Sequence, residues 1–105
     1  MNILFVCSRN QWRSKTAETI FKDTPGHHVR SAGTENAARI KVSGKLLQWA
    51  ELIFVMEKKH KDRLIEKFPG TWQDKEIVIL DIKDDYQYMD DELIDILRKS
   101  VEPYF

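Results

Sequence analysis

Short apolar runs separated by helical patterns constrain the fold of this chain most strongly. Residues 3–6 and 52–56 are apolar, as are residues 76–80 apart from Glu76, and these runs are rich in β-branched and aromatic side chains. A weaker run over residues 28–32 is closed by Gly33. These runs are too short for helices and are bounded by polar residues, so each is predicted to be a strand. Strands that alternate with helices predict an α/β fold, in which a parallel sheet carries helices on both faces.

The segments between the strands carry helix signals. One helical pattern opens at Arg13, Ser43 caps a second over residues 44–50, residues 58–68 form a third, and Asp90 caps the last. In the third pattern His60 shares an apolar face with Leu64 and Phe68, so we expect it to be packed against the core or its rim. Residues 35–41 are expected to be irregular and residues 81–90 to form an acidic loop.

The bulk composition indicates one soluble domain over residues 1–105. Lys plus Arg and Asp plus Glu each number 17, so no net charge attracts nucleic acid or a membrane surface. No apolar run approaches the roughly 20 residues that span a bilayer, and no signal-peptide pattern is present. The lone cysteine cannot form an intramolecular disulfide, which fits a reducing compartment. We therefore expect a cytoplasmic protein without nucleic-acid or membrane partners.

The residues that carry chemistry lie where the first strand meets the first helix. Cys7 follows the strand, and Arg13 and Ser14 open the helix. Loop amides and the helix dipole at such a junction bind oxyanions and favour a thiolate over a thiol. Arg13 offers two parallel donors to a phosphate, and the Ser14 hydroxyl can donate to the thiolate. The pattern predicts a phosphate cradle with Cys7 as nucleophile; the alternatives are a structural cysteine and a surface arginine.

The spacing Cys7-x5-Arg13-Ser14 directly after an N-terminal strand resembles the low-molecular-weight protein tyrosine phosphatases. Asn10, the Ala17-Glu18 pair and the Ser-Ala-Gly-Thr of residues 31–34 match the same family. The resemblance implies a four-stranded parallel sheet in the order 2-1-3-4, with the site beyond the carboxyl ends of the strands. It also implies hydrolysis of phosphotyrosine or another aryl phosphate through a phosphocysteine, with no cofactor and no metal.

The same resemblance implies roles for the loop. Arg13 and the backbone N–H groups of residues 8–14 would hold the phosphate, while Asn10 and Ser14 would hold the loop and the thiolate. Ser8 and Gln11 are expected to present their backbone N–H groups rather than their side chains. Trp12 either lines the pocket or anchors the loop in the core. Arg9 replaces the usual glycine, and a bulky side chain there affects the conformation of the loop.

The acidic loop is expected to supply the second catalytic group. Cleavage of a phosphate ester needs an acid for the leaving oxygen and then a base for water, and one carboxyl group can do both. The resemblance places this group at Asp84, but Asp85 stands where the family has proline, so the two can exchange roles. Tyr86, with Tyr88, either stacks on an aromatic leaving group or packs against the last helix. A metal site built from Asp81, Asp84 and Asp85 matches no calcium-loop spacing.

Three functions follow from these residues. The first is a phosphatase acting on a phosphorylated protein or a small aryl phosphate. The second is an arsenate reductase, which would need an external thiol because the chain has one cysteine. The third is a non-catalytic phosphate or phosphopeptide binder, which would bind an anion at Arg13 and be indifferent to Asp84→Asn. The chain is also shorter than the usual family member, so fewer residues are expected to form the entrance of the predicted substrate-binding pocket.

Overall fold

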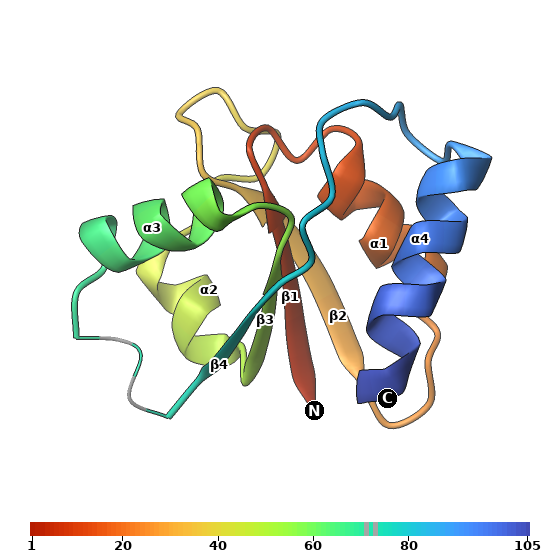
Figure 1. Cartoon of the computed structure of the whole chain (residues 1–105). Coiled ribbons are helices and arrows are strands. Elements are labelled where there is room, and N and C mark those ends of the chain that lie inside the picture. The colour runs from red at the N-terminus through yellow and green to blue at the C-terminus, as the bar shows by residue number, and fades with distance from the viewer. Residues whose placement is uncertain (71, 73) are drawn as a thin grey trace.

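The structure, a computed structural model, describes residues 1–70, 72 and 74–105. Its parallel sheet has the order β2-β1-β3-β4 and is built from β1 (Asn2–Cys7), β2 (His28–Gly33), β3 (Leu52–Val55) and β4 (Glu76–Ile79) (Figure 1). The helices are α1 (Arg13–Phe21), α2 (Gly44–Trp49), α3 (Lys58–Lys67) and α4 (Asp91–Val101), and a short 3-10 turn, η1 (Glu102–Tyr104), follows α4. The predicted fold class and strand order are therefore confirmed.

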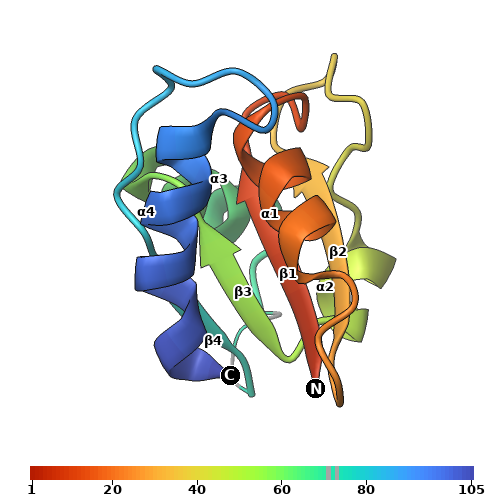
Figure 2. The ribbon, with the colours of Figure 1, turned by 90° about the vertical axis from the view of Figure 1, so that its right-hand side faces the viewer.

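The sheet is covered on both faces because successive side chains of a strand point to opposite sides. Ile3 and Phe5 of β1 belong to a core cluster with α1 and α4, whereas Leu4 and Val6 belong to a second cluster with α2 and α3. Figure 2 shows α1 and α4 in front of the sheet and α2 and α3 behind it. All four of these β1 side chains are fully buried. The continuous apolar run of residues 3–6 is thus explained by burial of the central strand on both faces.

Predicted helix starts coincide with hydrogen-bonded caps. Ser43 Oγ accepts the N–H of Leu46 at 3.2 Å, and the Asp90 carboxylate accepts the N–H of Glu92 at 2.9 Å. Each cap satisfies a backbone donor that the first turn of a helix leaves free. None of the helices in the described part of the chain is long and apolar enough to cross a membrane.

The topology gathers one set of loops at the carboxyl edge of the sheet. Cys7, the last residue of β1, pairs with Gly33 at the end of β2, and Val6 pairs with Val55 at the end of β3. Because the strands are parallel, the segments that follow them leave the sheet at the same edge (Figure 1). The order reverses between β1 and β3, so the loop after Cys7 lies at the switch point, beside the chain that leads from β3 into α3.

Candidate active site

The loop between β1 and α1 curls around the cysteine with its carbonyl groups turned outward. The segment that follows β2 supplies donors to four successive carbonyls: the N–H of Thr34 to Cys7 at 3.0 Å, of Glu35 to Ser8 at 3.0 Å, and of Arg39 to Arg9 at 3.0 Å, and Arg39 Nε to Asn10 at 3.1 Å. With the carbonyls engaged on the outside, the inner side of the loop is left to backbone N–H groups, which is the arrangement of an anion-binding nest.

Gly33 permits this close wrapping. A Cβ at this position would lie 2.5 Å from the carbonyl oxygen of Ser8 and 2.6 Å from Cβ of Ala38. Both distances are far below van der Waals contact, so a larger residue would push the two segments apart. The glycine is therefore needed for the close approach of the segment after β2 to the cysteine loop.

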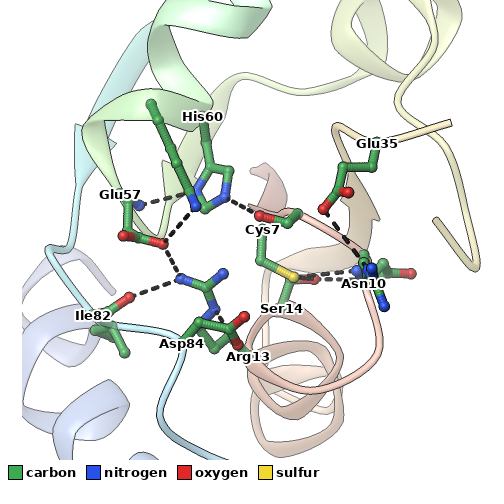
Figure 3. Close-up of polar contacts among 12 residues, drawn as sticks. Cys7, Asn10, Arg13, Ser14, Glu35, Glu57, His60, Ile82 and Asp84 are labelled. Atoms are coloured by element: carbon green, nitrogen blue, oxygen red, sulfur yellow. Dashed lines mark hydrogen bonds and ion pairs between the residues drawn. The ribbon is translucent and has the colours of Figure 1, made fainter. Parts of the chain in front are cut away.

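The sulfur of Cys7 lies among hydrogen-bond donors (Figure 3). Asn10 N–H donates to Sγ at 3.2 Å, and Ser14 Oγ is 2.9 Å from Sγ. The amide Nδ2 of Asn10 donates to Ser14 Oγ at 2.7 Å. Since an amide nitrogen can only donate, the hydroxyl hydrogen of Ser14 is left for Sγ at 2.9 Å or for the carbonyl of Ala32 at 3.4 Å. Both contacts hold the sulfur at the base of the loop.

Arg13 is held rigidly although it is charged and only 1% exposed. Its Nη1 donates to Glu57 Oε2 at 2.6 Å and to the carbonyl of Ile82 at 2.9 Å. Its Nε is buried and has no hydrogen-bond acceptor in the described chain, the carboxylate of Asp84 being 3.6 Å away. One corner of the guanidinium is therefore fixed by the protein, while a buried donor remains for a ligand oxygen.

Glu57 and His60 form a capping box at the start of α3. The Glu57 carboxylate and the His60 ring each accept from the other residue's backbone N–H, with His60 Nδ1 3.0 Å from the Glu57 nitrogen. His60 Nε2 is 2.9 Å from Ser8 Oγ. Burial, followed by the charge of Arg13, lowers the pKa of His60 to about 4. Burial opposes the shift at Glu57, but the hydrogen bond and charge of Arg13 hold its pKa below the usual value.

A pocket of about 210 Å³ opens above the cysteine loop. Its lining residues are Cys7, Ser8, Arg9, Gln11, Trp12, Arg13, Glu35, Lys59 and Asp84. Nucleophilic, cationic and acidic groups from the loops after β1 and β4 therefore share one cavity. Three or more His, Cys, Asp or Glu side chains suited to holding a metal ion are not found together among the described residues.

Known structures share this architecture at low sequence identity. The tyrosine phosphatase Wzb from Escherichia coli K30, in complex with phosphate, matches with a TM-score of 0.79 and 20% identity, covering 98% of this chain and 94% of that chain. The chain has the low-molecular-weight tyrosine phosphatase fold. The YwlE arginine phosphatase from Geobacillus stearothermophilus shares it, with a TM-score of 0.73, 22% identity and coverage of 98% and 92%.

A YwlE variant with a phosphorylated serine in its active site also matches, with a TM-score of 0.72, 23% identity, and coverage of 98% of this chain and 95% of that one. No family model matches the chain, and no curated protein sequence does. The likeness is therefore one of fold.

Within this phosphatase fold, the residues expected to bind substrate divide into two groups. Ser8, Arg9, Gln11 and Trp12 line the pocket with Cys7, and the Trp12 side chain is 42% exposed there. Asn10 and Ser14 are fully buried beneath the loop, where they bond to each other and to the sulfur. They shape the cradle rather than line it.

Two aromatic side chains of the acidic loop lie outside the pocket. Tyr86, expected as a pocket wall, is absent from the lining and packs instead against the core cluster beneath α4. Of the two alternatives for Tyr86, the structure agrees with packing against the last helix, because the loop turns the ring toward that core. Tyr88 bonds to Thr19 Oγ1 at 2.9 Å on α1. The aromatic contribution to the pocket therefore comes from Trp12.

Arg9, in place of the family's glycine, leaves the loop unstrained. The left-handed conformation in this loop falls on Asn10, whose φ is 57°, and not on Arg9. Asparagine tolerates this conformation better than most residues. The side chain of Arg9 is 65% exposed and lies 3.9 Å from the Glu35 carboxylate. Its bulk is accommodated in solvent at the mouth of the pocket.

Sequence reasoning missed two residues of the site. Glu57 is the partner of Arg13, and His60, expected only to pack, is the partner of Ser8. A signal for Glu57 was present, since it is a carboxylate just beyond the central strand β3 at the edge where the cysteine loop lies. For His60 the burial was foreseen and the hydrogen bond was not, because Ser8 was expected to contribute only its backbone.

Proposed function

We propose that this protein is a cysteine-dependent phosphatase that hydrolyses phosphomonoesters through a phosphocysteine. One observation carries the proposal: Cys7, whose sulfur has two hydrogen-bond partners, shares a pocket with a buried arginine whose Nε has no hydrogen-bond acceptor in the described chain. The pocket thus combines a nucleophilic sulfur with a site for a phosphate oxygen. Asp84 lines the same pocket, whereas Asp85 does not.

The reaction proceeds in two displacements. The Cys7 thiolate attacks phosphorus, the bond from phosphorus to the leaving oxygen breaks, and Asp84 donates a proton to that oxygen. A water molecule then attacks the phosphocysteine, Asp84 takes its proton, and the sulfur–phosphorus bond breaks to give phosphate and the thiolate. Arg13 and the loop N–H groups stabilise the charge on the equatorial oxygens in both steps. Neither step requires an electron donor or a metal.

The substrate we propose is a phosphorylated protein side chain, with phosphotyrosine or another aryl phosphate preferred. The structural neighbours are a tyrosine phosphatase and an arginine phosphatase, so phosphoarginine is the natural competitor. Trp12 favours the aryl phosphate, since its exposed ring at the pocket can stack on an aromatic leaving group. A thiolate nucleophile works in a reducing compartment, which supports a cytoplasmic location.

The test is hydrolysis of nitrophenyl phosphate with EDTA present, comparing wild type with Cys7→Ser, Asp84→Asn and the matched control Asp85→Asn. We expect Cys7→Ser to abolish turnover, Asp84→Asn to slow it about a hundredfold, and Asp85→Asn to leave it nearly unchanged. Peptides carrying phosphotyrosine or phosphoarginine then identify the substrate. Turnover that survives Cys7→Ser would contradict the proposal. Phosphate binding without turnover would favour a binding module.

A further inference from the structure

The hydrogen bonds of His60 determine where its proton lies. The backbone N–H of Glu57 points at Nδ1 at 3.0 Å, and a backbone N–H can only donate, so Nδ1 carries no hydrogen. His60 is 1% exposed and lies near the charge of Arg13, and both effects keep the ring neutral, with a pKa of about 4. A neutral imidazole carries one N–H, which must therefore lie on Nε2.

This tautomer sets the direction of the bond to Ser8. His60 Nε2–H donates to Ser8 Oγ at 2.9 Å, so the serine oxygen is the acceptor. The hydroxyl hydrogen of Ser8 is then directed elsewhere, and it has no acceptor among the residues that the structure describes. Ser8 lines the pocket that holds Cys7 and Arg13. Ser8 also lines the adjoining pocket that His60 lines. An anion bound beside Cys7 and Arg13 would supply an acceptor for the hydroxyl hydrogen.

We propose that His60 is a positioning residue that holds the Ser8 hydroxyl as a hydrogen-bond donor to the bound phosphoryl group. This inference rests on the proposed function for its catalytic consequence, but its binding consequence requires only that phosphate occupies the pocket. The cysteine loop thereby gains a side-chain donor in addition to its backbone N–H groups. The start of α3 holds two members of the site in place, since Glu57 fixes Arg13 (Figure 3). His60 in turn fixes Ser8.

The capping role of His60 has to be separated from its bond to Ser8. In His60→Asn, the side-chain oxygen stands near the position of Nδ1 and can still accept from Glu57, but the side chain is too short to reach Ser8. Ser8→Ala removes the hydroxyl and leaves the cap intact. The matched control is Ser43→Ala, which removes a serine cap at α2, away from the pocket. It should lower stability without changing phosphate affinity.

The experiment is a double-mutant cycle with inorganic phosphate as the probe, measured by calorimetry, alongside kcat and KM for nitrophenyl phosphate. Ser8→Ala and His60→Asn should each weaken phosphate binding about tenfold, as expected for loss of a hydrogen bond to a charged group. Because His60 acts through Ser8, the double variant should be no weaker than Ser8→Ala alone. If the two losses multiply, His60 does not act through Ser8 and the proposal is wrong.

A measurement on the unaltered protein gives a second test. Nitrogen NMR shifts of the imidazole should show hydrogen on Nε2 and none on Nδ1, at neutral pH and with phosphate bound. Hydrogen on Nδ1 would overturn the proposal whatever the variants do. Wild-type protein that binds phosphate but does not turn over nitrophenyl phosphate would refute the proposed phosphatase activity, and the binding cycle would still decide the role of His60.

Discussion

Replacing Glu57 by alanine tests how Arg13 is kept buried. The change removes the carboxylate 2.6 Å from Nη1 and leaves a 1% exposed guanidinium with the Ile82 carbonyl and the more distant Asp84. Breaking a buried ion pair costs about 3–5 kcal/mol. Glu57 is 27% exposed, so solvent compensates in part, and we expect a loss of about 2 kcal/mol in the free energy of unfolding. Glu57→Gln, which retains an oxygen acceptor, should lose about half as much.

Urea unfolding followed by tryptophan fluorescence measures this loss. A slope of about 2 kcal/mol per molar urea for a small domain converts the expected loss into a midpoint shift of about 1 M. The matched control is Asp62→Ala on the same helix, which breaks an exposed pair with Lys58 at 3.3 Å and should change stability by less than about 0.5 kcal/mol. If Glu57→Ala is no more destabilising than Asp62→Ala, the account of Arg13 is wrong.

Three further predictions concern packing, pH and leaving groups. Gly33→Ala should destabilise the fold by about 2 kcal/mol and weaken phosphate binding, because its Cβ would meet the carbonyl oxygen of Ser8. The control Gly44→Ala, which has open space around the new Cβ, should do neither. Urea unfolding measures the stability of the two variants, and calorimetry measures their phosphate binding. Since the pKa of His60 falls from 6.5 in the unfolded chain to about 4 in the folded one, the unfolded chain binds the proton first on acidification. The free energy of unfolding should therefore fall by about 2–3 kcal/mol between pH 6.5 and 4. Unfolding titrations of His60→Gln should show a flatter dependence on pH. An unchanged dependence would contradict the lowered pKa of His60. Asp84→Asn should slow the hydrolysis of phenyl phosphate more than that of dinitrophenyl phosphate, because dinitrophenolate is the better leaving group and needs less protonation. Equal effects on the two substrates in stopped assays would rule out Asp84 as the acid.

Local patterns predicted most of the fold. Short runs of apolar residues predicted the strands, and the capping residues Ser43 and Asp90 predicted the starts of two helices. Both signals depend on a few neighbouring residues. Strand order came from the resemblance to a known family, since pairing between strands far apart in the sequence leaves no local trace. The loop from Cys7 to Ser14 could be singled out for the same reason as the strands, because its residues are neighbours in the chain.

The parts of the site that escaped prediction depend on contacts between distant segments. Glu57 lies 44 residues from Arg13, and His60 lies 52 residues from Ser8. Composition says nothing about which carboxylate an arginine will meet. The choice between Asp84 and Asp85 was open for a related reason, because neighbouring side chains of an extended loop point in different directions. Only the path of that loop across the sheet edge turns Asp84 toward Arg13.

Trapping the covalent intermediate decides whether Cys7 is the nucleophile. Asp84→Asn should accumulate a phosphocysteine from dinitrophenyl phosphate, because this substrate leaves without an acid while the water step loses its base. Acid quenching followed by mass spectrometry should find one phosphoryl group, on the peptide that contains Cys7. Turnover with no phosphorylated Cys7, or with the phosphoryl group on another residue, would contradict the account.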